Sequence, residues 1–95
     1  MTREEIEDIL RVEKEYLKRE FYVEKIGLFG SYVRNEQKGS SDIDVLVEFS
    51  KPVGFEFITL KNYLEDLFNK PVDLVTVRAL KPIMKEEILN EVQFQ

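Results

Sequence analysis

Two aspartates stand at the start of a stretch that otherwise predicts a β-strand. Asp42 precedes and Asp44 interrupts the apolar residues Ile43, Val45 and Val47, a pattern of period two, although strands disfavour aspartate. Because residues i and i+2 of a strand point to one face, the two aspartate Cα atoms should lie roughly 6 to 7 Å apart. Such close like charges repel unless a cation lies between them. Mg²⁺ accepts one or two carboxylates and completes its coordination with water and phosphate oxygens, so the pair predicts half of a metal site.

A glycine and a serine follow an apolar run upstream of this pair. The run Ile26–Phe29 ends in Gly30 and Ser31, twelve residues before Asp42, which predicts a strand that turns into a helix. Glycine lets the chain turn tightly and lets a ligand approach, while serine can cap the helix and offer its hydroxyl group. Because helix N-termini attract phosphates, we expect a phosphate-binding turn here. Arg34 either binds the same anion through two hydrogen bonds or forms a surface salt bridge.

The order of these elements limits the topology of the sheet. Gly30 ends one strand and Asp42 begins the next, so both meet one ligand only if the two strands are antiparallel. A third aspartate, Asp73, lies near the start of the apolar run Val72–Val77, after a predicted helix. Strand, helix and strand predict a right-handed parallel crossover, which brings Asp73 to Asp42 and Asp44. Three carboxylates can hold two Mg²⁺ ions for in-line displacement at phosphorus.

The combined pattern resembles a known superfamily. A Gly-Ser pair, ten residues, Asp-x-Asp and a further Asp on a later strand are similar to the DNA polymerase β-like nucleotidyltransferases. More narrowly, the chain resembles the minimal nucleotidyltransferase (MNT) family. The resemblance covers nearly the whole chain, because the segment Ala79–Pro82 followed by a short terminal helix is also similar to how these small proteins end.

The resemblance implies a role for each matching residue. It implies that Asp42, Asp44 and Asp73 are the metal ligands and catalytic residues. It also implies that Gly30 and Ser31 form the phosphate-binding turn. Arg34 stands where family members usually carry arginine, and we include it among the nucleotide-binding residues. The family commonly has glycine at the next position, where this sequence has Asn35, so the loop conformation is the point at which the chain departs from the pattern.

Length and composition restrict the classes of protein that fit. Residues 1–95 are expected to form a single minimal nucleotidyltransferase domain, too short for a second substrate-binding domain. The expected fold class is α/β, of the α+β kind, with a small mixed sheet of three or more strands flanked by helices. The absence of cysteine and histidine removes disulfides and histidine-centred zinc sites, which leaves oxygen-ligated metal.

Charge and hydropathy argue against a nucleic acid or a membrane as the direct partner. The net charge is −5, and no basic stripe exists to neutralise nucleic-acid phosphates. No apolar run approaches the roughly 20 residues that span a membrane, and the N-terminus lacks the apolar segment of a signal peptide. We therefore expect a cytoplasmic protein with no direct nucleic-acid or membrane partner.

Periodicity places the remaining elements. We expect helices over about 3–20 and 54–69, the first with a Thr2–Glu5 capping box, and a last helix begun by Pro82. The second helix carries three apolar residues outside its buried face, Phe55, Ile58 and Tyr63. This second face predicts either a protein contact or side chains that merely flank the core.

These observations lead to one preferred function and two alternatives. The preferred function is transfer of AMP from Mg-ATP, with two Mg²⁺ ions as cofactors, to a hydroxyl acceptor. By resemblance, MNT proteins pair with HEPN-domain toxins in toxin–antitoxin modules and adenylylate a tyrosine of the toxin, so a HEPN-domain partner is expected. The alternatives are an antitoxin that acts by binding alone and a small-molecule nucleotidyltransferase. The oligomeric state, including a homodimer, is left open.

Overall fold

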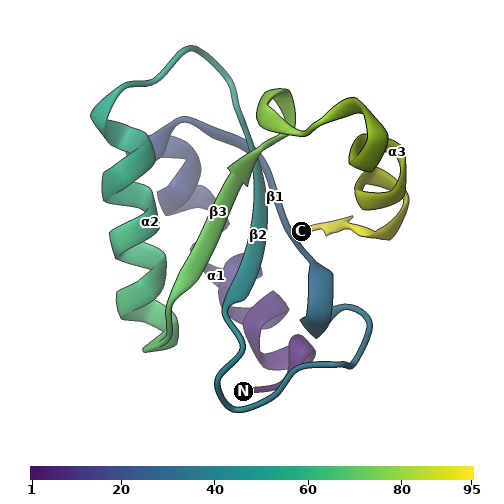
Figure 1. The fold of residues 1–95 in the computed structure, drawn as a ribbon. Helices are drawn as coiled ribbons and strands as arrows, with labels where there is room; N and C mark the ends of the chain where they lie inside the picture. The colour runs from purple at the N-terminus through teal and green to yellow at the C-terminus, as the bar shows by residue number, and fades with distance from the viewer.

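A computed structural model describes residues 1–95 and shows three helices around a small sheet (Figure 1). In chain order the elements are α1 (Arg3–Phe21), β1 (Val23–Phe29), the 3₁₀ turn η1 (Gly30–Tyr32), β2 (Ile43–Phe49), α2 (Phe55–Phe68), β3 (Val72–Thr76), the 3₁₀ turn η2 (Val77–Ala79), α3 (Pro82–Glu91) and β4 (Gln93–Phe94). The expected mixed α/β fold is confirmed. No helix combines the length and the apolar character that crossing a membrane requires.

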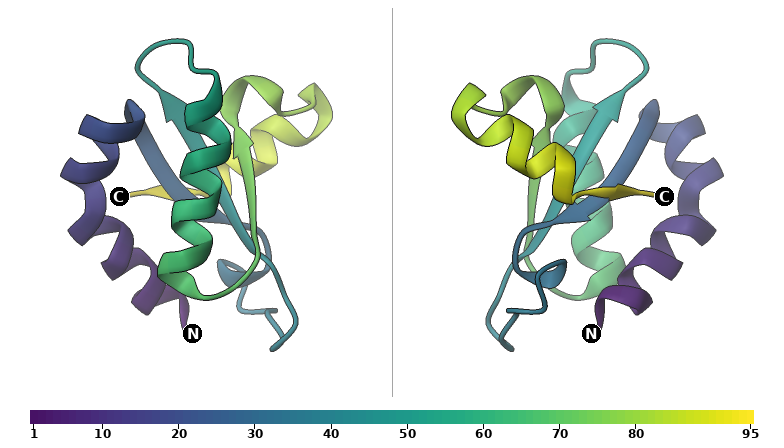
Figure 2. Two further views of the ribbon diagram at one scale, coloured as in Figure 1. Left: turned by 90° about the vertical axis from the view of Figure 1, so that its left-hand side faces the viewer. Right: turned by 90° about the vertical axis from the view of Figure 1, so that its right-hand side faces the viewer.

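The sheet has the topology that the sequence predicts for its first three strands. Its order is β3-β2-β1-β4, with β1 antiparallel to β2 and β3 parallel to β2. The two views of Figure 2 show α1 and α2 on one side of the sheet and α3 on the other. Strand β4, which pairs antiparallel with the outer edge of β1, was not expected, because two residues are too few to produce a periodic pattern.

Side-chain alternation along β2 divides the core into two layers. Ile43, Val45 and Val47 are fully buried against the layer of α1 and α2. Leu46 points to the other face, where it packs with Ile88 of α3 and with Val92. Each face of a strand therefore has its own helical cover, as period-two alternation requires, and Asp44, two residues before Leu46, belongs to the α3 face.

The ends of the helices follow the sequence signals closely. Thr2 and Glu5 form the predicted capping box, in which the Thr2 hydroxyl accepts from the Glu5 N–H at 3.2 Å and Glu5 accepts from the Thr2 N–H at 3.0 Å. Helix α1 ends where Tyr22 takes a left-handed φ of +60°. Pro82 occupies the first turn of α3, as predicted, because its missing N–H has no partner there in any helix.

The second face of α2 divides between the two interpretations that the sequence left open. The Tyr63 hydroxyl donates to Glu13, and its ring packs on Tyr16 and Phe21 of α1 at centroid distances of 5.2 and 5.5 Å. Tyr63 therefore flanks the core. Phe55 and Ile58 stay 85% and 56% exposed, so of these three residues of α2 only Phe55 and Ile58 are available for contact with another protein.

Replacing Gly27 by alanine should detach the C-terminal strand. Gly27 pairs with Phe94, and a Cβ atom there would lie 2.5 Å from the Gln93 carbonyl oxygen, a backbone atom that cannot rotate away. We expect a loss of roughly 1–3 kcal/mol in unfolding free energy, or a fall in Tm of about 5–15 °C, with faster amide exchange over residues 92–95. The matched control is Gly39→Ala, where a Cβ meets nothing within 4 Å. Equal Tm values for the two variants would contradict this account of β4.

Candidate active site

Two of the three predicted carboxylates are neighbours in the sheet. Asp44 of β2 is in register with Asp73 of β3 on one side and with Phe29 of β1 on the other. Register partners on adjacent parallel strands point to the same face, which here is the face that carries α3. Residues 29 apart in the sequence thus meet at one point because the β2-α2-β3 crossover starts both strands at the same edge.

The carboxylate of Asp44 lies in an unfavourable environment for a negative charge. Partial burial, the largest cause, together with the negative charges of Asp73 and Asp42 raises the pKa of Asp44 to about 6, while the positive charge of Arg34 opposes them. Asp73 and Asp42 are themselves exposed. A group of carboxylates that repel one another in this way favours a bound cation.

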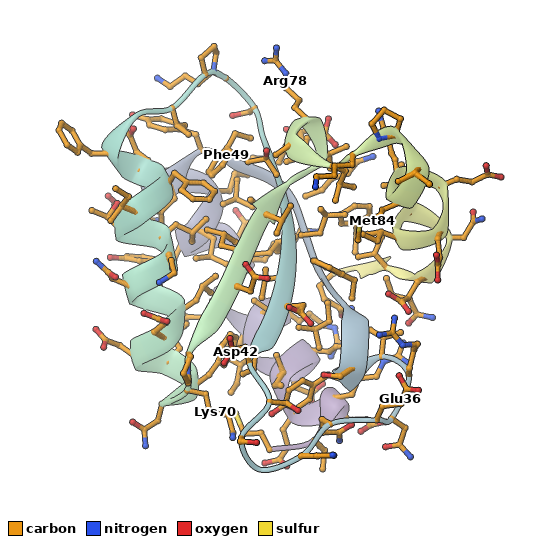
Figure 3. The ribbon with its side chains drawn as sticks, in the orientation of Figure 1. Glu36, Asp42, Phe49, Lys70, Arg78 and Met84 are labelled. Carbon is orange, nitrogen blue, oxygen red and sulfur yellow. The ribbon has the colours of Figure 1, made fainter.

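Asp42 lies outside the ladder of the sheet. Strand β2 begins at Ile43, whose N–H donates to the Pro71 carbonyl oxygen at 3.0 Å, so Asp42 is the residue directly before the strand. Figure 3 labels Asp42 where the loop enters β2. In the structure no three acidic side chains come close enough together to hold one ion. Asp44 and Asp73 are brought together, and Asp42 stands beside them, near enough to act on Asp44 by charge.

Gly30 brings the predicted phosphate-binding turn against these carboxylates. Its φ of +76° is in the left-handed region, and a Cβ atom at this position would lie 2.2 Å from Oδ2 of Asp44. Only glycine fits both the backbone conformation and the space. The end of β1 and the start of β2 therefore form one continuous surface, as the antiparallel topology predicts.

The helix expected after Ser31 is a single 3₁₀ turn, and Ser31 does not cap it. The turn closes when the N–H groups of Val33 and Arg34 both donate to the Gly30 carbonyl oxygen at 3.1 Å. The chain then reverses at Asn35, with a left-handed φ of +59°, which ends the helical geometry. Asparagine tolerates this conformation better than most residues, which explains how it stands where the family pattern has glycine.

Arg34 forms the salt bridges that were one of its two predicted roles. Its guanidinium donates to Glu36 at 2.7 Å and to Oε1 of Glu91 at 2.8 Å. The other oxygen of Glu91 accepts from the N–H of Gly30 at 2.8 Å. Sequence reasoning missed Glu91, because a glutamate at the end of a surface helix carries no signal that it reaches a turn 61 residues away.

The residues present fit Mg²⁺ in their chemistry. All three predicted ligands are aspartates, which offer the hard oxygen donors that this ion requires. Burial and the nearby carboxylates raise the pKa of Asp44, so a cation would be stabilised beside it, and the absence of a side chain at Gly30 lets the turn approach Asp44 closely. An oxygen-ligated divalent cation is consistent with this donor set.

A large hollow in the structure lies away from these carboxylates. It has a volume of about 770 Å³ and lies between the loop after β2 and η2, lined by Phe49, Lys51, Val53 and Arg78 among others. Figure 3 labels Phe49 and Arg78 at the opposite end of the sheet from Asp42. We place the site at Asp44 because the hollow contains no pair of carboxylates, whereas phosphoryl chemistry depends on charge more than on enclosure.

The fold and this arrangement of carboxylates define a nucleotidyltransferase. The family model described as a nucleotidyltransferase domain matches residues 10–94, and the chain belongs to this family. The protein adenylyltransferase MntA of Thermococcus cleftensis is 46% identical over 95 residues, which cover 99% of this chain and 96% of that protein. The predicted relationship to the minimal nucleotidyltransferases, a class of enzymes, is confirmed.

Solved structures show the same fold. A structure described as a minimal nucleotidyltransferase matches with a TM-score of 0.84 and 30% identity, over 98% of this chain and 95% of that chain. A complex of a tri-AMPylated HEPN toxin with its MNT antitoxin from Shewanella oneidensis matches with a TM-score of 0.64, over 93% of this chain and 70% of the other. The identity in that second case is 21%, so it supports the fold alone.

Proposed function

We propose that this protein is the antitoxin of a toxin–antitoxin module and transfers AMP from Mg-ATP to a tyrosine hydroxyl of a HEPN-domain toxin. The observation that carries the proposal is the register pair Asp44–Asp73, which lies against the Gly30 turn. Identity of 46% to a protein adenylyltransferase over the full chain supports a protein as the acceptor.

Each residue of the site has a part in this reaction. Ser31, through its hydroxyl and the neighbouring N–H groups, binds the β- and γ-phosphates. Asp73, exposed beside Asp44, orients the acceptor hydroxyl and takes its proton on a carboxylate oxygen. The acceptor oxygen then bonds to the α-phosphorus as the bond to the β-phosphate oxygen breaks, and pyrophosphate leaves in line. Catalysis of this kind rests on positioning and charge neutralisation.

The proposed cofactor is a pair of Mg²⁺ ions held by Asp42, Asp44 and Asp73. When bound, Mg²⁺ supplies charge neutralisation for the triphosphate and lowers the pKa of the acceptor hydroxyl. The carboxylates supply the negative charge that this requires, and the Gly30 turn keeps the phosphates within reach of them. Ser31 lies in η1 directly after β1, Asp42 directly precedes β2, and Asp44 and Asp73 lie on β2 and β3.

The acceptor is proposed to come from another chain. Exposed apolar side chains offer it two separate surfaces, one on α2 with Phe55 and Ile58 and one on α3 with Ile83 and Met84. Such residues outside the core are typical of protein contacts. A hetero-oligomer with the toxin in the cytoplasm follows from this proposal, with a homodimer of the antitoxin as a further arrangement to be tested.

The test is the intact mass of the cognate partner after incubation with this protein and Mg-ATP. We expect increments of one or more AMP units, and none with Asp42→Ala plus Asp44→Ala. The matched control is Asp66→Ala, because Asp66 is an exposed aspartate on α2, on the other side of the sheet, and should leave the increments unchanged. A complex that forms without any increment would instead make the protein a binding antitoxin. Pyrophosphate release with small hydroxyl acceptors alone would indicate a small-molecule enzyme.

A further inference from the structure

The carboxylate of Glu91 joins two groups of the phosphate-binding turn. Its Oε2 accepts from the backbone N–H of Gly30 and its Oε1 from the Arg34 guanidinium, both at 2.8 Å. The Glu91 side chain is only 14% exposed, whereas that of Arg34 is 50% exposed. One buried anion therefore fixes both the first residue of η1 and the cation that follows it.

The position of Glu91 is itself determined by the fold. Glu91 is the last residue of α3, and the next residue, Val92, packs on Leu46 under the sheet. The chain then pairs with β1, where the N–H of Gln95 donates to the Ile26 carbonyl oxygen at 2.9 Å. Because Ile88, before Glu91, packs on Leu46 as Val92 does, contacts on both sides of Glu91 hold it near the end of β1.

Glu91 accepts from only one backbone N–H group of the turn, and two others have no partner among the turn and loop bonds. Of the backbone hydrogen bonds in turns and loops, none uses the N–H of Ser31 or of Tyr32. The donor of Gly30, by contrast, is satisfied by Glu91 and is not available to a ligand in this conformation. In the view of Figure 3, η1 lies between the labelled residues Asp42 and Glu36, and the Arg34 guanidinium joins Glu36 to Glu91.

We propose that Glu91 is a positioning residue for nucleotide binding, which holds the Gly30 turn so that the N–H groups of Ser31 and Tyr32 stay available to phosphate oxygens. The inference rests on the proposed function and adds a residue to it. Glu91 touches no substrate atom and acts through Gly30 and Arg34. Without it, a partly buried N–H would lack an acceptor and the turn would lose the contact that fixes its left-handed residue.

The test is the affinity of the full chain for Mg-AMP-PNP, measured by calorimetry. Glu91→Ala should weaken binding about 10-fold, because it unmakes a charged hydrogen bond to the turn, and Glu91→Gln about 3-fold, because its amide oxygen still accepts from Gly30. The transfer rate at saturating Mg-ATP should fall much less, since lost ground-state binding raises KM and spares kcat. The Gly30 amide proton should exchange faster in Glu91→Ala even without nucleotide.

The controls separate this role from a merely structural one. Glu87→Ala changes an exposed glutamate of the same helix that has no ion pair and should leave affinity unchanged. If circular dichroism shows that Glu91→Ala does not fold, the affinity of Glu91→Gln for Mg-AMP-PNP decides between the two roles. The inference is overturned if both Glu91 variants bind Mg-AMP-PNP with wild-type affinity. It is also overturned if they bind more tightly, because Glu91 would then compete with phosphate for the turn. A wild-type chain that binds no Mg-AMP-PNP overturns the proposed function, and this inference with it.

Discussion

Replacing Asp44 by asparagine is expected to abolish adenylyl transfer while making the free protein more stable. Asp44 lies against the Gly30 turn and is the register partner of Asp73, so we expect its charge to serve both the cation and the triphosphate. Loss of a single preorganised electrostatic group costs about 10²–10³ in rate, and we expect at least that loss of AMP increments on the partner. Asparagine keeps the shape of the side chain and removes only the charge.

The gain in stability follows from the pKa of Asp44. Burial and the charges of Asp73 and Asp42 raise this pKa to about 6, above its value in the unfolded chain. The folded protein therefore binds the proton more tightly, so this contribution to stability is complete below about pH 4 and is lost as the pH rises through 6. At pH 7 the charged carboxylate opposes folding, by roughly 1 kcal/mol once solvent screening is allowed for. Asp44→Asn removes this cost and should raise Tm by about 4–8 °C.

Thermal unfolding from pH 4 to pH 8, without Mg²⁺, checks this prediction. The wild type should lose stability relative to Asp44→Asn across this range, and the two curves should converge at the acid end. Addition of Mg²⁺ should raise the Tm of the wild type but not that of the variant, because binding to the folded state alone stabilises it. Asp66→Asn, an exposed position on α2, serves as the control. A variant less stable than the wild type at pH 7 would show that Asp44 supports the fold.

The fold was predictable because local patterns and topology rules agree. Apolar alternation located β1, β2 and β3, and the handedness of the crossover then placed Asp73 beside Asp44. The Thr2–Glu5 capping box and Pro82 gave the first residues of α1 and α3. Strand alternation, helix caps and the crossover rule all depend on residues that are close in the sequence. They predict the structure well because the alternation of apolar residues fixes which face of each strand is buried.

The parts that were not predictable depend on contacts between distant segments. The β4 pairing requires Gly27 to meet Gln93 at backbone distance, and the Gly30–Glu91 bond spans 61 residues. Neither has a local pattern. The helix expected at Ser31 is a single turn for a different reason, because the left-handed Asn35 ends the helical geometry directly after the bonds from Val33 and Arg34 to Gly30. The role of each site residue stays a prediction until the variants are measured.

Replacing Gly30 by alanine is expected to destroy the site and to destabilise the fold. The φ of +76° at this position costs a residue with a side chain roughly 1–2 kcal/mol. Separately, the new Cβ would lie 2.2 Å from Oδ2 of Asp44, so the carboxylate must leave its place beside Asp73. We expect a fall in Tm of about 5–15 °C together with loss of Mg-AMP-PNP binding and of AMP transfer. Gly39→Ala, with open space around it, should change neither.

A double-mutant cycle separates the two penalties of Gly30→Ala. In an Asp44→Ala background the clash partner is gone, so Gly30→Ala should then cost only the backbone strain, and the difference between the two backgrounds measures the clash. A smaller loss of stability in the Asp44→Ala background is the expected result. Equal losses in both backgrounds would mean that the turn moves away from β2 without cost, and the close approach of Gly30 to Asp44 would then not be what holds the phosphate-binding turn at the carboxylates.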